Sequence, residues 1–219
     1  LSAPCASCSN MTPQPPAALA GSPEPADLFV SDTVQWLERA VIGLNLCPFA
    51  KGVHVKSQIH YAVTLATEPD EVLQVLRSEL ADLMAATALA RDTTLLILPQ
   101  CLPDFLDFND FLAEAEGVLE SMDLVGTVQI ASFHPQFQFA GTDVDDVTNC
   151  TNRSPYPTLH LLREESIDRA VEAFPEAEAI FERNMEVLED LGMDGWVALQ
   201  VGASCPAAPA PSKNIGVQP

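Results

Sequence analysis

The sequence predicts a single α/β domain in which helices cover a mixed, mostly parallel sheet; a ferredoxin-like arrangement is the alternative. Three observations support this fold class. Strand-like and helix-like segments alternate between residues 31 and 200. The chain has 219 residues and is 47% hydrophobic, which is enough for one core. The Pro- and Ala-rich segments 1–30 and 201–219 lack apolar periodicity, so we expect them to be disordered tails.

The first expected element is a helix that begins at Ser31 or Asp32, because either side chain can cap a helix N-terminus. Apolar residues follow at helical spacing. Glycine costs about 1 kcal/mol in a helix interior, so we expect this helix to end at Gly43. Residues 58–65 then alternate between apolar and polar side chains, which predicts a strand. Residues 70–86 return to helical spacing and predict a second helix.

A second strand and a second crossover follow. Residues 93–98 form a continuous apolar run with β-branched side chains, which is typical of a strand covered on both faces. An apolar stripe predicts a helix at 104–121, and alternation returns in a third strand at 127–133. Strands separated by helices favour parallel pairing, so we expect the first three strands to be parallel through right-handed crossovers.

The connection after the third strand has the composition of a functional site. It is longer than 20 residues and is rich in aromatic residues, prolines, amides, histidines and arginines. Loops of this length are functional or disordered, and disordered segments are poor in aromatic residues. Open α/β sheets usually bind ligands at the carboxyl ends of their strands. We therefore expect a binding or catalytic loop at this edge of the sheet.

The remaining segments complete the predicted domain. Residues 158–162 could form a fourth strand. Helical patterns follow at 166–174 and 176–191, and Gly192 is expected to close the last helix because glycine is favoured at that position.

Charge and cysteine content exclude several classes of protein. A net charge of −21 opposes binding to nucleic acid and to anionic membranes, because both require clustered basic residues. Six cysteines are too few for a disulfide scaffold at this length. No run of 18 apolar residues and no signal-peptide pattern occurs, so we expect a cytoplasmic protein.

Cys47 is the first candidate catalytic residue. The Cys47-Pro48 sequence can place the thiol at the start of a short helical turn, where backbone N–H groups and Lys51 would lower its pKa. The thiol would then be a nucleophile. If the preceding helix instead continues to Leu46, Cys47 is a small buried hydrophobic residue.

His134 and His160 are the other two candidate catalytic residues. His134 follows the third strand and precedes a proline, so its ring can project toward a substrate. His160 alternates with Leu159 and Leu161 and therefore faces the opposite side of the fourth strand. Each histidine could act as a general base, or as a metal ligand together with Cys47. The alternative is that each is a hydrogen-bonded structural histidine.

Scarce basic residues concentrate in or beside two unusual segments, which are residues 45–52 around Cys47 and the connection after the third strand with the strand that follows it, residues 133–163. Between the tails there are nine Lys and Arg residues against 29 Asp and Glu residues, and four of the nine lie in or beside these segments. Such clustering predicts a positive pocket for the carboxylate or phosphate of a small anionic molecule. The alternative is that the arginines tie the loop to nearby carboxylates. The expected substrate-binding residues are Asn45, Lys51, Asn152, Arg153, Tyr156 and Arg163.

Four motifs resemble a known family. They are GLNLCPFAK at 43–51, DFLDFNDFL at 104–112, SFHP with FAG within 132–141, and TNRSPYP leading into HLLRE within 151–164. Together they resemble the bacterial family catalogued as domain of unknown function 1415, over roughly residues 33–199. The resemblance implies a bacterial-type cytoplasmic domain and implies no established reaction or cofactor.

Three functions fit these residues. The first is a small-molecule enzyme that acts on an anionic substrate, with Cys47 as nucleophile or redox thiol and His134 and His160 as acid and base. The second is a metal-binding hydrolase or oxygenase that uses the same three residues as ligands. The third is a non-catalytic ligand-binding or interaction module. The first two require the two unusual segments to meet in one cleft.

Overall fold

A computed structural model describes residues 25–173 and 179–203, which fold around one mixed sheet of order β1-β2-β4-β3. Strands β1 and β2 are parallel, and β4 is antiparallel to both of its neighbours, β2 and β3. The first three strands therefore share one direction, and the mixed sheet predicted from the sequence is confirmed. The strands are β1 (Ile59–Val63), β2 (Thr93–Ile97), β3 (Val128–Phe133) and β4 (Thr158–Arg163).

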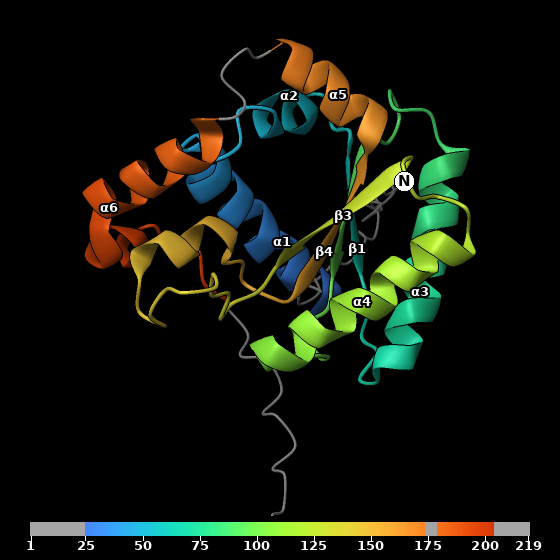
Figure 1. The fold of residues 1–219 in the computed structure, drawn as a ribbon, viewed down its shortest axis with the longest axis horizontal. Coiled ribbons are helices and arrows are strands. Elements are labelled where there is room, and N and C mark those ends of the chain that lie inside the picture. Colours follow the sequence, from blue (N-terminus) through green and yellow to red (C-terminus); the bar gives the residue numbers. More distant parts are fainter. Residues whose placement is uncertain (1–24, 174–178, 204–219) are drawn as a thin grey trace, which may run out of the picture.

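Helices cover both faces of the sheet. Figure 1 shows α3 and α4 together on one side, with α1, α2, α5 and α6 on the other. The helical segments are α1 (Pro25–Trp36), η1 (Leu37–Ile42), α2 (Ala50–Val55), α3 (Pro69–Ala85), α4 (Phe105–Ser121), η2 (Val147–Asn152), α5 (Glu164–Ala173) and α6 (Ile180–Ala198). Each described strand and long helix lies within a few residues of its predicted position, except that α1 begins earlier and α6 continues to Ala198, beyond its predicted end at residue 191.

The main core lies between the sheet and the α3–α4 pair. Leu96, Leu159 and Leu161 point to this side of the sheet and are fully buried against the apolar stripes of the two helices. Asp104 caps α4, because its carboxylate accepts hydrogen bonds from two backbone N–H groups of the first turn. This side of the sheet is filled by the core, and the large cavity of the domain lies on the opposite face.

The first helix differs from its prediction. It begins at Pro25 rather than at Ser31 or Asp32, and Asp32 is buried within it. The helix then widens into the π-helical segment η1 and ends at Gly43, where the sequence placed its end. A Cβ atom at Gly43 would lie 2.2 Å from the backbone oxygen of Arg39, so only glycine fits this close approach. π-Helical turns occur frequently at functional sites.

The C-terminal helix bends where the sequence placed its end. Gly192 has φ 67° and ψ 169°, and this left-handed residue interrupts α6. Most of each predicted tail lies outside the described residues. Within the described ranges, no helix combines the length and the apolar character needed to cross a membrane.

Candidate functional site

A cavity of about 750 Å³ lies on the face of the sheet opposite the α3–α4 core. This volume is within the range of about 300–1,000 Å³ that is typical of small-molecule sites. All four strands contribute to its floor, and η1, α2 and α5 form its walls. Most of the lining is apolar, as in ligand pockets generally. Apolar lining residues include Trp36, Leu37, Val41, Ile59, Leu95, Ala131, Phe133, Leu162 and Ile167.

The register of the sheet explains why His160 lies in this floor. His160 pairs with Leu95 on one side and with Ala131 on the other, so these three side chains form one row across β2, β4 and β3. Paired residues share a face, and their immediate neighbours along each strand point the other way. Leu159 and Leu161 accordingly join the opposite core. The predicted facing of His160 is confirmed.

A hydrogen bond to Thr93 fixes the tautomer of the neutral His160 ring. The Thr93 hydroxyl donates its only proton to the backbone oxygen of Leu161 at 2.7 Å. It can therefore only accept at its second contact, which is Nε2 of His160 at 2.7 Å. The ring thus carries its proton on Nε2. Its Nδ1 has no hydrogen-bond partner among the described residues, and burial lowers the pKa of His160 to about 4.

Cys47 contributes a thiol to the wall of the same cavity. It lies in the turn that joins η1 to α2 and is half-buried. Burial raises the pKa of the Cys47 thiol, while hydrogen bonding from the backbone N–H groups of Phe49 and Ala50 lowers it by a smaller amount. The N–H contacts expected from the Cys-Pro sequence are therefore present, but desolvation outweighs them. The resting thiol is protonated at neutral pH.

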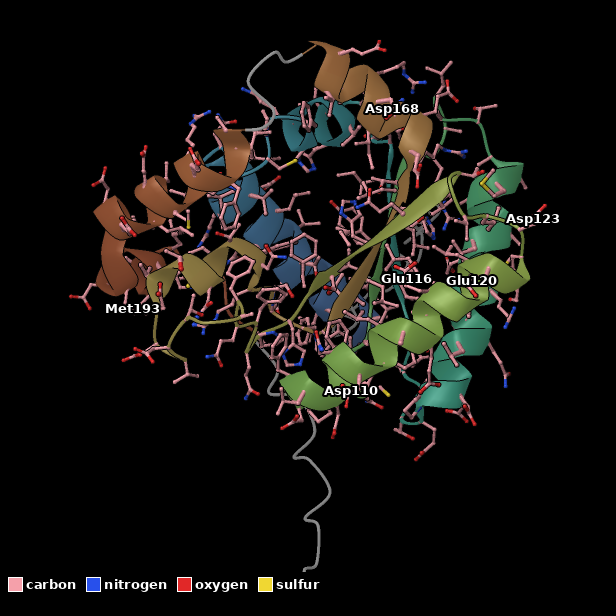
Figure 2. The ribbon with its side chains drawn as sticks, viewed as in Figure 1. Asp110, Glu116, Glu120, Asp123, Asp168 and Met193 are labelled. Atoms are coloured by element: carbon pink, nitrogen blue, oxygen red, sulfur yellow. The ribbon has the colours of Figure 1, made fainter. Side chains whose placement is uncertain are left out.

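The charges at the cavity differ from those of the whole chain. Carboxylates dominate the exposed surface, for example Asp110 and Glu120 on α4 and Asp168 on α5 (Figure 2). The cavity lining, by contrast, includes two basic side chains, Lys56 and Arg163, and one carboxylate. That carboxylate, Asp92, accepts a hydrogen bond from Ser166 at 2.6 Å.

Arg163 is held by the backbone rather than presented as a clamp. Its guanidinium donates to the backbone oxygens of Leu83 and Ala86 at the C-terminus of α3, and to that of Arg91. The charge lies beside the cavity, but its hydrogen bonds are used to hold α3 against β4. The hydrogen bonds of Arg163 thus go to the backbone, and its role in substrate binding stays a prediction.

His134 lies outside the cavity. It is fully buried after β3, where its ring packs against Phe105 and Phe108. Its Nε2 donates to the backbone oxygen of Leu102 at 3.1 Å, and its Nδ1 accepts from the backbone N–H of Gln136 at 3.0 Å. Burial lowers the pKa of His134 to about 4. Both ring nitrogens are occupied, which favours the alternative of a hydrogen-bonded structural histidine, and the catalytic role of His134 stays a prediction.

Arg153 and Tyr156 also stabilise the loop rather than lining the cavity. Arg153 donates to the backbone oxygens of Phe137 and Val144, which ties the loop to itself. Tyr156 is fully buried, and its hydroxyl donates to the carboxylate of Asp32 at 2.7 Å. The predicted role of both residues as direct substrate ligands is not supported by this geometry.

The three remaining predicted binding residues lie in different places. Asn45 is exposed with φ 55°, and its amide oxygen accepts from the Arg183 guanidinium at 2.8 Å in the orientation that satisfies both groups. Lys51 is exposed on α2 and is not among the residues that line the large cavity. Asn152 lines a second, smaller cavity of about 180 Å³, which also includes Cys47 and Phe133.

The predicted three-residue metal site does not form. Cys47 and His160 share the large cavity, whereas His134 faces the α4 side of the sheet. Within residues 25–173 and 179–203, no group of three or more His, Cys, Asp or Glu side chains is placed to hold a metal ion.

Several cavity residues were missed by the sequence reasoning, and Thr93 is the most important. It begins a continuous apolar run, in which nothing marks the face to which a hydroxyl points. Gln129 and Ser166 were missed as well, although the alternation at 127–133 placed Gln129 opposite the apolar core residues. Lys56 was recognised only as part of a basic cluster.

Comparison with known proteins gives a family and no activity. A family model described as "Protein of unknown function (DUF1415)" matches residues 29–198. Neither the curated proteins nor the solved structures include a match to this chain. The matched residues extend from α1 through α6 and include the whole sheet and both cavities. The chain therefore belongs to the DUF1415 family.

Proposed function

We propose that this protein is a small-molecule enzyme whose substrate is a mainly apolar molecule with an acidic group. The substrate occupies the large cavity, where Cys47 and His160 act on it. The observation that carries this proposal is that a thiol and an imidazole with a free Nδ1 line one cavity of about 750 Å³ whose remaining surface is mostly apolar. Few polar groups in an apolar pocket are the usual features of a small-molecule site.

The acidic group is inferred from the charges at the lining. Lys56 is exposed at the cavity, its ammonium has no ion-pair partner within residues 25–173 and 179–203, and the Arg163 charge lies nearby. In a chain with a net charge of −21, a site with more basic than acidic side chains favours an anion locally. Lys56 therefore replaces Arg153 and Arg163 as the expected direct anion contact.

In the free protein, the protonation states of Cys47 and His160 favour an order in which the substrate binds first and the reaction follows. At neutral pH the Cys47 thiol is protonated and His160 is neutral, because burial disfavours the charged form of each. An acidic ligand group beside the imidazole would raise the pKa of His160 and would so favour transfer of a proton to Nδ1. Chemistry is thus coupled to occupation of the cavity.

The test uses a fluorescent probe with the proposed features, 8-anilinonaphthalene-1-sulfonate, which is aromatic and anionic. Ala131→Phe places a larger side chain in the cavity floor beside His160. Ala113→Phe makes the same change at an exposed position of α4, on the far side of the sheet. We expect saturable binding by the natural protein and by Ala113→Phe, and at least tenfold weaker binding by Ala131→Phe.

Equal probe affinity for all three proteins would show that the cavity is not the binding site. Lys56→Gln should weaken binding of the probe without abolishing it, because the apolar contacts remain. Turnover of a bound molecule would then be sought in the natural protein and in Cys47→Ala. Binding without turnover in either protein would support the non-catalytic alternative.

A further inference from the structure

The smaller cavity adjoins the large one at Cys47. It has a volume of about 180 Å³ and is lined by residues of η1, β3, η2 and α6 and by the turn after η1. Val41, Cys47 and Phe133 line both cavities. Cys47 therefore lines two chemically different spaces. Besides these three residues, the lining consists of Leu46, Thr151, Asn152 and Asn184.

Two asparagines with partly unused amide groups line this space. Asn184 is 5% exposed, and its Nδ2 donates to the backbone oxygen of Leu46 at 2.8 Å. The Nδ2 of Asn152 donates to the backbone oxygen of Ser132 at 3.2 Å. A bond from N–H to a carbonyl fixes the orientation of each amide. Each Oδ1 is then left as an acceptor, and the second N–H of each amide as a donor, without a partner among the described residues.

The oxygen of Asn184 is not sealed inside the protein. Among the described residues, the hydroxyl of Tyr61 is the one fully buried side-chain N or O atom that lacks a partner. The unpartnered Oδ1 of Asn184 must therefore retain accessible surface, and the small cavity lies beside it. The hydroxyl of Thr151 donates to the backbone oxygen of Thr148, so it too can only accept within the cavity.

We infer that the small cavity is a subsite for a neutral hydrogen-bond donor group, such as a primary carboxamide, of the molecule that occupies the large cavity. Its free polar atoms are the acceptor oxygens of Asn152, Asn184 and Thr151 and the second N–H of each amide, so a primary carboxamide, which both donates and accepts, satisfies them. No basic side chain lines the space, and no carboxylate is present to balance an ammonium ion. This inference rests on the proposed function, because it assigns a second chemical group to the same ligand.

Two alkylating reagents that react at Cys47 test the inference directly. Iodoacetamide carries an N–H donor group, and methyl iodoacetate is neutral and similar in size but has no donor. Their rates at Cys47 are measured in the full chain by site-resolved mass spectrometry and are divided by their rates with N-acetylcysteine. A neutral hydrogen bond is worth roughly a three- to tenfold change in rate, so we expect a corrected preference of that size for iodoacetamide.

Substitution of the acceptors should remove the preference. Asn184→Leu and Asn152→Leu each replace one carboxamide with two methyl groups, and either variant is expected to bring the corrected ratio close to one. Asn152 is only partly buried, so its variant serves if Asn184→Leu does not fold. Asn109→Leu makes the matched change at an exposed position of α4 and should retain the full preference.

The inference is overturned if the natural protein shows no corrected preference, or if both asparagine variants keep it. A faster corrected reaction with anionic iodoacetate than with iodoacetamide would also overturn it, since no basic side chain lines the space to balance a carboxylate. None of these results affects binding of 8-anilinonaphthalene-1-sulfonate or its loss in Ala131→Phe. Failure of the subsite is therefore distinguishable from failure of the proposed function.

Discussion

The burial of His134 predicts a specific loss of stability at acidic pH. The folded protein holds this histidine with its pKa lowered to about 4, against an ordinary value of 6.5. That difference corresponds to about 3 kcal/mol. Above pH 6.5 the imidazole is neutral in both states and contributes no pH dependence. As the pH falls below 6.5, the unfolded chain binds a proton that the folded chain resists, so stability is lost until about pH 4.

The variant His134→Gln isolates this contribution. Glutamine does not titrate, and its amide can still donate to the backbone oxygen of Leu102, as Nε2 of His134 does. Urea unfolding of both proteins at pH 7 and pH 5 gives the change in unfolding free energy for each. We expect the natural protein to lose about 2 kcal/mol more than the variant over this interval.

The comparison of the two pH dependences removes contributions that both proteins share. Carboxylates and His160 titrate in both, and a constant difference at pH 7 reflects only the lost contacts of the imidazole. If the two proteins lose the same free energy between pH 7 and pH 5, His134 is not held neutral and the argument from its burial is refuted.

Three further predictions concern the backbone, the α3 contact and the thiols. Gly43→Ala should destabilise the protein by about 2–3 kcal/mol, because its Cβ would overlap the backbone of η1. Gly117→Ala in α4, where a Cβ meets nothing within 4 Å, should stabilise the protein by roughly 0.5–1 kcal/mol in the same denaturation assay. If Gly43→Ala were instead the more stable variant, the close approach of residue 43 to the backbone of Arg39 would be contradicted. Arg163→Gln should lower the free energy of unfolding by roughly 1–3 kcal/mol, because carbonyl oxygens at the end of α3 lose a charged donor. An unchanged midpoint of urea unfolding would show that these hydrogen bonds are not formed. Iodoacetamide should label Cys47 faster than the buried Cys101, and both more slowly than an exposed thiol at pH 8, because burial raises the pKa of each. Equal and slow labelling would remove the Cys47 thiol from the site.

Periodicity was sufficient to predict the elements of the sheet and of the long helices. Strands covered on one or both faces and amphipathic helices have different apolar repeats, and these repeats depend little on the rest of the fold. The facing of His160 followed from the same alternation. The start of α1 was misplaced because Asp32, a good capping residue, is used to bind Tyr156 across the domain instead. A tertiary contact of this kind leaves no local pattern.

The candidate site was only partly predictable for a related reason. A loop rich in His, Arg, Asn and Tyr can bind a ligand, or it can satisfy its own backbone, and its composition is the same in both cases. Here His134 and Arg153 donate mainly to backbone oxygens of neighbouring segments. Cys47 and His160 lie more than 100 residues apart in the chain and line one cavity only because the fold brings the turn after η1 and β4 to the same space.

The central claim is that a ligand of this protein occupies the cavity against His160, whose ring carries its proton on Nε2. The most direct measurement is a long-range ¹H–¹⁵N spectrum of the histidine rings at pH 7, recorded with and without saturating 8-anilinonaphthalene-1-sulfonate. We predict that His160 shows the Nε2-protonated form in the free protein and that its Nδ1 resonance shifts on binding, while His134 stays unchanged. An Nδ1-protonated ring, or a bound probe that leaves His160 unaffected, would contradict the account.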